Sequence, residues 1–267
     1  MAHTTPEDKE RRMTLTMAWV RKVGETEEMI IASDSRLRSL GAWDAAPKII
    51  PLPRGDAAIA FAGETNYAYP IMLQAINSIN AYGGALSRRQ PLAKLKGHLI
   101  RVVNLMLDQL TDIPRDLWEA PAAFFLLAGY DWTTHEFKIW KLHFDKATRR
   151  FTFSPGNPWR GEGHDEKVLS IIGDEIDEAR AVLVEFLRTP DGIRPGAFDM
   201  EPMKALAFMI DSDRFHSIGG HIQMVKVYKA LQCVPFIISR DGTRSLMGRP
   251  LLDYEKSESV PTLTLDY

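Results

Sequence analysis

Three polar residues near the start of the chain are of types that take part in nucleophilic and acid–base chemistry. Thr14 heads the first predicted strand, Asp34 ends the second, and Lys48 begins the third. A hydroxyl, a carboxylate and an ammonium group are common components of enzyme sites. Each residue alone also has an ordinary role, as a β-branched strand residue, a turn former or a solvated charge. Their combination matters because sequential strand pairing would bring all three to one end of a sheet.

The elements expected to position these residues are short strands followed by paired helices. In the first strand, alternation predicts that Leu15, Met17 and Trp19 share one face. Periodicity and turn-forming residues predict strands at 14–20, 28–34, 47–52, 57–62, 122–129, 136–144, 150–154, 167–172, 221–229 and 233–239. Helical spacing of apolar residues predicts helices at 64–82, 91–110, 175–188 and 200–212.

The grouping of these elements predicts the fold class. Strands and helices come in clusters, whereas a doubly wound parallel sheet would alternate single strands with single helices. We therefore expect an α+β protein built as a four-layer αββα sandwich of two antiparallel sheets flanked by helix pairs. The expected domain plan is a flexible extension or propeptide at 1–13 and a single domain at 14–267. That domain would have an extended region at 131–166 and a C-terminal extension after about residue 240.

Composition argues against several classes of partner. The 267 residues carry a net charge of −2 with acidic and basic residues interleaved, so no basic stripe for nucleic acid is present. Apolar runs are too short to cross a bilayer, and the polar N-terminus lacks the apolar core of a signal peptide. The single cysteine, Cys233, permits no disulfide within the chain, which fits a reducing cytoplasm. His216 and His221 have no further ligands at metal-binding spacing, so no metal site is expected.

Three segments of the chain resemble the N-terminal third of the proteasome β-subunit family, which includes the bacterial heat-shock-locus V and Anbu-type peptidases. The segments are TLTMAWV, MIIASDSRLRSLGAWDAAPKI and AAIAFAGETNYA. In that family the first strand opens with a nucleophilic Thr, Asp-x-Arg or Asp-x-Gln follows the second, Lys begins the third, and Ala-Gly ends the fourth. The matching residues are Thr14, Asp34 with Arg36, Lys48 and Gly63, and ASDSR is most similar to the Anbu-type branch.

The resemblance implies an N-terminal-nucleophile (Ntn) hydrolase fold and a peptide or amide substrate, with no metal or organic cofactor. Thr14 would be the nucleophile, and its own α-amine, with a pKa of about 7.7 to 8.0, would be the base once Thr14 is the first residue. A protonated Lys48 would lower the pKa of that amine, and Asp34 would orient Lys48. The backbone N–H of Gly63 would donate to the oxyanion. Arg36 would brace the loop after Asp34 or lie on the surface as a cation.

Two other stretches depart from the family pattern. Asp174 stands where relatives carry the serine of a Gly-Ser-Gly motif, and its carboxylate could accept a hydrogen bond there or cap the following helix. Ile218 stands at a serine position and Phe215 at an aspartate position. Phe61 either lines the specificity pocket or belongs to the core. These departures support an alternative, a non-catalytic assembly or regulatory protein with an uncut N-terminus, while a small-molecule amidase shares the same three polar residues.

The residues in front of Thr14 raise the question of how its amine would become free. Met13 precedes Thr14, whereas Gly commonly precedes the nucleophile in relatives with propeptides. Thr14 could become the first residue by autocatalytic cleavage, or by translation from Met13 followed by removal of the initiator Met, which we favour. The resemblance also implies a homo-oligomer, as rings or open helical stacks, and an unfoldase or adaptor as partner.

Overall fold

The computed structural model describes residues 14–38, 41–112, 119–156, 159, 167–255 and 257–266. The expected extension or propeptide at 1–13 lies outside the described residues, as does much of the C-terminal part of the region at 131–166. None of the helices in the described ranges is long and apolar enough to cross a membrane.

The larger sheet contains the predicted first two strands and most of the C-terminal part of the chain. Its strands are β1 (Leu15–Val23), β2 (Thr26–Ser33), β10 (Leu169–Gly173), β13 (Gln223–Tyr228), β14 (Gln232–Arg240), β15 (Thr243–Leu246), β16 (Arg249–Pro250) and β17 (Thr262–Thr264). They are arranged in the order β10, β1, β2, β13, β14, β15, β16, with β17 beside β14. β1 is antiparallel to both neighbours, so Leu15 lies opposite Gly173 and Thr16 opposite Ser33. The start of β1 is therefore adjacent to the ends of β2 and β10.

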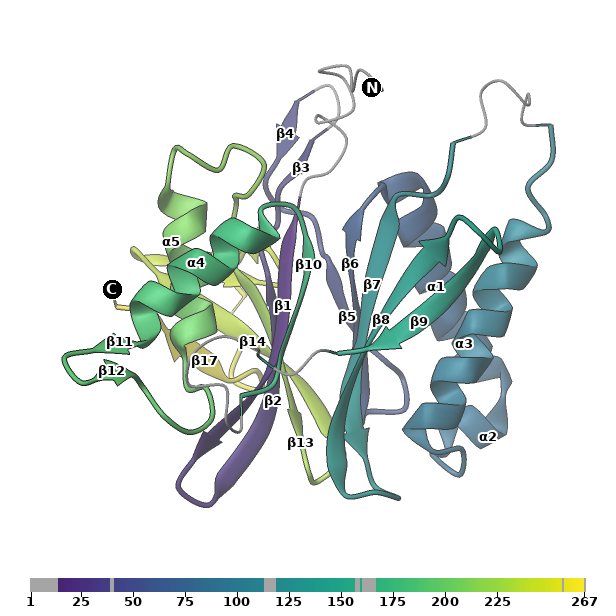
Figure 1. Cartoon of the computed structure of the whole chain (residues 1–267), viewed down its shortest axis with the longest axis horizontal. Coiled ribbons are helices and arrows are strands. Elements are labelled where there is room, and N and C mark those ends of the chain that lie inside the picture. Colours follow the sequence, from purple (N-terminus) through teal and green to yellow (C-terminus); the bar gives the residue numbers. More distant parts are fainter. Residues whose placement is uncertain are drawn as a thin grey trace.

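The smaller sheet is an antiparallel meander of five strands. They are β5 (Ile49–Pro51), β6 (Ala57–Gly63), β7 (Ala123–Asp131), β8 (Glu136–Asp145) and β9 (Arg150–Pro155). Figure 1 shows the two sheets facing each other. Helices α1 (Thr65–Ala81), α2 (Gly83–Leu86) and α3 (Leu92–Leu107) pack on the outer side of this sheet. Helices α4 (Ile176–Leu187) and α5 (Glu201–Asp211) pack on the outer side of the larger one.

The central strands are buried on both faces, which explains why their sequences are apolar almost throughout. On β1, Leu15, Met17 and Trp19 pack with residues of α4 and α5, whereas Ala18 and Val20 pack between the two sheets. The alternation predicted for this strand is therefore confirmed. Burial of both faces fixes the strand register, because a slip of one residue would exchange the two sets of side chains.

The prediction of a four-layer αββα sandwich of two antiparallel sheets flanked by helix pairs is wrong. The described residues are 39% strand and 26% helix, with only five helices, and they form four sheets. Two of these sheets are small hairpins, β3 (Leu37–Arg38) with β4 (Ala42–Trp43) and β11 (Arg188–Thr189) with β12 (Gly192–Ile193). Strands of two residues produce no periodicity in the sequence, so they resemble turns.

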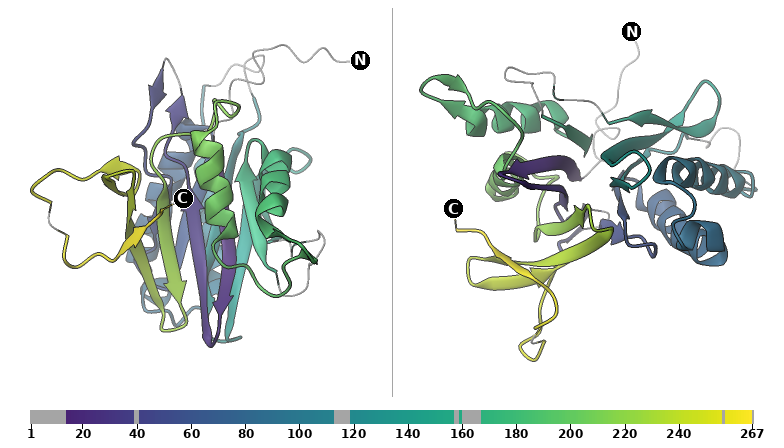
Figure 2. Two further views of the ribbon diagram at one scale, coloured as in Figure 1. Left: turned by 90° about the vertical axis from the view of Figure 1, so that its left-hand side faces the viewer. Right: turned by 90° about the horizontal axis from the view of Figure 1, so that it is seen from below.

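The chain after residue 240 is a second reason for the correction. It adds β15, β16 and β17 to the larger sheet, and β17 runs parallel to β14. Figure 2 shows these strands, in yellow, along the edge of the molecule away from α1 and α3. The result is a mostly β structure with one mixed sheet.

Candidate active site

Thr14, Asp34 and Lys48 lie together, and each has no exposed surface. Thr14 directly precedes β1, Asp34 follows β2, and Lys48 directly precedes β5. The three residues do not share one sheet, however, because β5 belongs to the smaller sheet. The expectation that sequential strand pairing would join them is therefore wrong. Lys48 instead reaches Asp34 across the space between the sheets.

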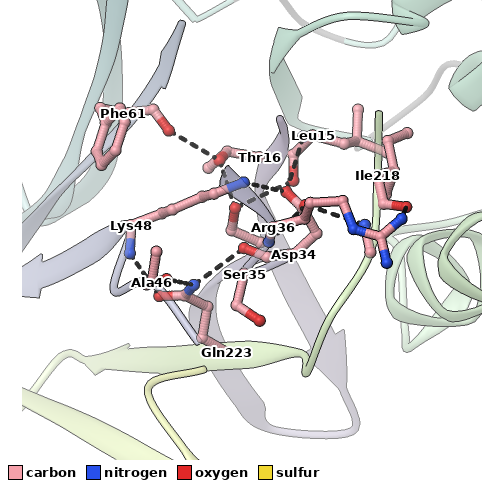
Figure 3. A network of polar contacts seen from close by, with 12 residues as sticks. Leu15, Thr16, Asp34, Ser35, Arg36, Ala46, Lys48, Phe61, Ile218 and Gln223 are labelled. Carbon is pink, nitrogen blue, oxygen red and sulfur yellow. Dashed lines mark hydrogen bonds and ion pairs between the residues drawn. The ribbon is translucent and has the colours of Figure 1, made fainter. Parts of the chain in front are cut away.

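The carboxylate of Asp34 is the centre of a network of hydrogen bonds (Figure 3). Its Oδ1 accepts from the backbone N–H of Leu15 at 3.1 Å and from Lys48 Nζ at 2.8 Å. Its Oδ2 accepts from the backbone N–H groups of Arg36 and Gly219, each at 3.1 Å. Four donors orient this buried carboxylate and compensate its charge, which burial alone would strongly disfavour.

The ammonium group of Lys48 is placed close to the backbone of Thr14. Lys48 Nζ and the Leu15 N–H both donate to Asp34 Oδ1, so the two nitrogens are close to each other. The pKa of Lys48 is lowered overall, because burial outweighs the opposing effect of Asp34; Arg36 lowers this pKa further, and Asp174 raises it by less than Asp34 does. A titratable cation therefore lies beside the residue that follows Thr14.

The backbone of Thr14 is held from the other side by the end of β10. Its carbonyl oxygen accepts the N–H of Asp174 at 3.0 Å. Gly173 has a φ of +120°, and a Cβ placed there would lie 1.8 Å from the same oxygen. Because only glycine leaves room for this approach, Gly173 helps to fix the position of Thr14.

We expect Gly173→Ala to displace Thr14 and to weaken the site more than it weakens the fold. The new methyl group would overlap the Thr14 carbonyl, so the Asp174 N–H bond to that oxygen would lengthen or break. Thermal unfolding and reaction with a threonine-directed probe, measured on a chain that begins at Thr14, test this. Gly192→Ala is a matched control, because Gly192 also has a positive φ, +119°, but has no atom within 4 Å of an added Cβ. Equal reactivity in the two variants would contradict the prediction.

Gly63, the predicted oxyanion donor, ends β6 in a conformation that needs glycine. Its φ is +97°, and an added Cβ would lie 2.0 Å from the carbonyl oxygen of Ala122. Two residues earlier, the N–H of Phe61 donates to the carbonyl of Lys48 at 3.0 Å. Successive N–H groups of a strand alternate in direction, so the N–H of Gly63 points to the same side of β6 as that of Phe61. That is the side on which Lys48 lies.

Arg36 braces two loops around Asp34. Its Nε and Nη2 donate to the carboxylate of Asp44 at 2.7 and 2.9 Å, and its Nη1 donates to the carbonyl of His216 at 3.3 Å. Of the two roles considered for Arg36, these contacts correspond to the bracing role. The paired geometry with Asp44 also gives the loop a fixed orientation.

Asp174 directly follows β10 and is one residue away from the N-cap of the next helix. The N-cap residue of α4 is Glu175, which has a φ of +51° and makes no side-chain capping bond. Asp174 is therefore not the N-cap residue that the sequence suggested. Asp174 lies beside Thr14, because its N–H donates to the Thr14 carbonyl, and its carboxylate acts to raise the pKa of Lys48 by less than Asp34 does.

The residues at the positions that depart from the family pattern belong to the hydrophobic core. Phe215 and Ile218 are 4% and 1% exposed and pack with α4 and α5. Phe61 packs on the helix side of the smaller sheet, with its ring 5.1 Å from that of Tyr69. Of the two interpretations of Phe61, the structure matches the core aromatic. The side chains at these three positions therefore contribute hydrophobic packing.

Two further observations narrow the chemistry that the described residues can perform. No group of three or more His, Cys, Asp or Glu side chains within the described ranges could hold a metal ion. Burial raises the pKa of the Cys233 thiol to about 12, which leaves almost none of the reactive thiolate at neutral pH. Cys233 is therefore a poor nucleophile.

Sequence reasoning missed three contributors to the site. Gly219 donates its backbone N–H to Asp34, Asp44 pairs with Arg36, and Gln223 binds the backbone around Asp34 and Lys48. The pair of glycines at 219 and 220 was a visible signal of a tight backbone turn. A single glutamine inside an apolar strand gave no such signal.

No protein-family model matches this chain, and no curated protein matches it. The functional interpretation therefore depends on the geometry of the site and on the motif resemblance in the first part of the sequence.

Proposed function

We propose that this protein is a threonine-type Ntn amidohydrolase, a proteasome-like peptidase that acts through Thr14 once Thr14 is the first residue. The observation that carries the proposal is the shared acceptor Asp34 Oδ1, which binds both Lys48 Nζ and the N–H of Leu15. This arrangement puts a buried cation next to the backbone of Thr14, whose hydroxyl lies directly in front of β1. The motif order Thr14, Asp34, Lys48 and Gly63 gives further support.

The reaction follows from the chemistry of these groups. The free α-amine of Thr14 takes the proton from its own Oγ1, and the oxygen attacks the carbonyl carbon of a peptide or amide bond. The N–H of Gly63 donates to the oxyanion. The amine of the substrate leaves with the proton, and an ester to Thr14 remains, which water then hydrolyses. Lys48, held charged by Asp34, keeps the α-amine neutral near physiological pH, because a second positive charge beside it is disfavoured.

A chain in which Thr14 still follows Met13 is inactive under this proposal. Thr14 is bonded to Met13 in the sequence, so its nitrogen is an amide and cannot act as a base. Thr14 also has no exposed surface, so a substrate cannot reach its hydroxyl. The buried hydroxyl favours the second candidate, a non-catalytic assembly or regulatory protein with an uncut N-terminus. The two candidates differ in whether Thr14 becomes the first residue.

A covalent probe that acylates N-terminal threonine separates the two candidates. We expect a chain that begins at Thr14 to react with the probe and to hydrolyse fluorogenic peptides, and Thr14→Ala to do neither. Thr14→Ser, which keeps the hydroxyl and the α-amine, should retain labelling. Equal labelling of the Thr14→Ala variant would rule out Thr14 as the nucleophile.

The proposal also covers the cellular location, the assembly and the partner of the enzyme. We place it in a reducing cytoplasm, supported by the single cysteine, and as a homo-oligomer that works with an unfoldase or adaptor, supported by the motif resemblance.

A further inference from the structure

Gln223 is a fully buried glutamine on β13 whose side-chain amide uses all of its hydrogen-bonding capacity (Figure 3). Its Oε1 accepts from the backbone N–H groups of Lys48 at 2.8 Å and Ile49 at 3.3 Å. Its Nε2 donates to the carbonyls of Asp34 and Ala46, each at 2.9 Å. An amide offers two donors and two acceptor positions, so no capacity remains for another partner. The four partners also define the orientation of the amide, because exchanging its oxygen and nitrogen would place donors against donors and acceptors against acceptors.

These four bonds join the backbones of two site residues that come from different sheets. Asp34 follows β2 of the larger sheet, and Lys48 precedes β5 of the smaller one. Gln223 lies opposite Ser33 on the strand next to β2, so it is in register with the end of that strand. Its side chain therefore fixes how far the backbone of Lys48 is from that of Asp34, and hence where Lys48 Nζ meets Oδ1.

The C-terminal part of the chain covers this amide. Gly248, in the turn between β15 and β16, has a φ of +89°. A Cβ placed there would lie 2.7 Å from the Cβ of Ser35, 3.1 Å from the oxygen of Ala46 and 3.3 Å from Gln223 Nε2. The close approach excludes water from the bonds that Gln223 makes. The segment after residue 240 therefore supports the site as well as the edge of the sheet.

We propose that Gln223 is a positioning residue of the candidate active site, which sets the contact between Lys48 and Asp34 and through it the basicity of the Thr14 amine. This inference rests on the proposed function. Without the amide, four buried backbone groups lose their partner, and the strand that carries Lys48 can move relative to Asp34. Lys48 then lies farther from Thr14 and lowers the pKa of its amine less.

The test uses the chain that begins at Thr14 and measures the rate of probe acylation against pH. In Gln223→Met, which keeps the length of the side chain but not its hydrogen bonds, the midpoint of the acidic limb should rise by about one pH unit, as expected for a weakened interaction between two nearby cations. Val227→Ala is the matched control. Val227 is also fully buried on β13, but its side chain is apolar and belongs to the hydrophobic cluster between the sheets. This substitution should lower thermal stability and leave the midpoint unchanged.

The outcomes distinguish this inference from the proposed function. If the wild-type chain is not acylated at any pH, the proposed function fails and the role of Gln223 fails with it. If the wild type reacts and Gln223→Met has the same midpoint, the positioning role alone is wrong. If Gln223→Met does not fold, Gln223→Glu replaces it. That variant keeps an acceptor for Lys48 and Ile49 and loses a donor, so its midpoint should also rise, and an unchanged midpoint would overturn the inference.

Discussion

A chain that begins at Thr14 and carries Lys48→Met is expected to react with a threonine-directed probe about 10²- to 10⁴-fold more slowly than the wild type, the range typical for loss of acid–base assistance. The same change should lower the free energy of unfolding by about 3–5 kcal/mol, because it leaves a buried carboxylate without its cation. Lys48 and Asp34 both have 0% exposed side chains and are 2.8 Å apart. Chemical denaturation and probe kinetics measure the two effects separately.

The smaller sheet offers a matched control for this prediction. Arg54 and Asp56 form a second ion pair with 0% exposed side chains, 2.6 Å apart, in the turn between β5 and β6. This turn is at the opposite end of β5 from Lys48. Arg54→Met should therefore cost a similar free energy of unfolding while the folded protein keeps its rate of acylation. If both variants lose reactivity in proportion to their stability, the loss in Lys48→Met reflects unfolding and not chemistry.

The second large effect, on acylation by the probe, is expected from the presence or absence of Met13 in front of Thr14. A chain that retains Met13 should not be acylated at all, whereas the chain that begins at Thr14 should react fully. The reason is that the amide nitrogen of an internal threonine carries no basic lone pair, so the hydroxyl has no adjacent base. Translation from Met13, with and without inhibition of methionine removal, yields the two chains, and intact mass confirms which is present.

Met13 could block the access of the probe to Thr14 as well as remove the basicity of its amine, so the two chains need a control that separates these effects. Chemical acetylation of the Thr14 amine adds only a small group but removes the base, so the acetylated chain should also fail to react. Full reaction of the acetylated chain, or of the chain that keeps Met13, would show that the α-amine is not the base. A residue such as Lys48 would then have to take that role.

The sequence predicted local structure well where both faces of a strand are buried. β1, β2, β6 and the helices α1, α3, α4 and α5 lie close to their expected positions. Helical spacing of apolar residues in the helices, and apolar runs bounded by turn formers in the strands, explain this success. The hairpins β3–β4 and β11–β12 and the strands β16 and β17 were not predicted, because segments of two or three residues carry no period. Their omission contributed to the wrong fold class.

The proximity of Thr14, Asp34 and Lys48 in the folded chain was harder to derive from the sequence than the individual strands and helices. The sequence indicated that these residues stand at strand ends, but the physical reason given for their proximity was wrong, since Lys48 comes from the facing sheet. Which sheet a strand joins depends on contacts between distant parts of the chain. The role of Gln223 was hidden for the same reason, because its partners at Asp34 and Lys48 are more than a hundred residues away.

One measurement tests the central claim most directly: the intact mass of the natively expressed protein before and after reaction with the probe, with the adduct mapped to a residue. We predict a chain that begins at Thr14 and gains one adduct, located on Thr14. A chain that begins at Thr14 and gains no adduct, or gains it on another residue, would contradict the account. A native protein that persists at full length would contradict it equally and would favour the non-catalytic alternative.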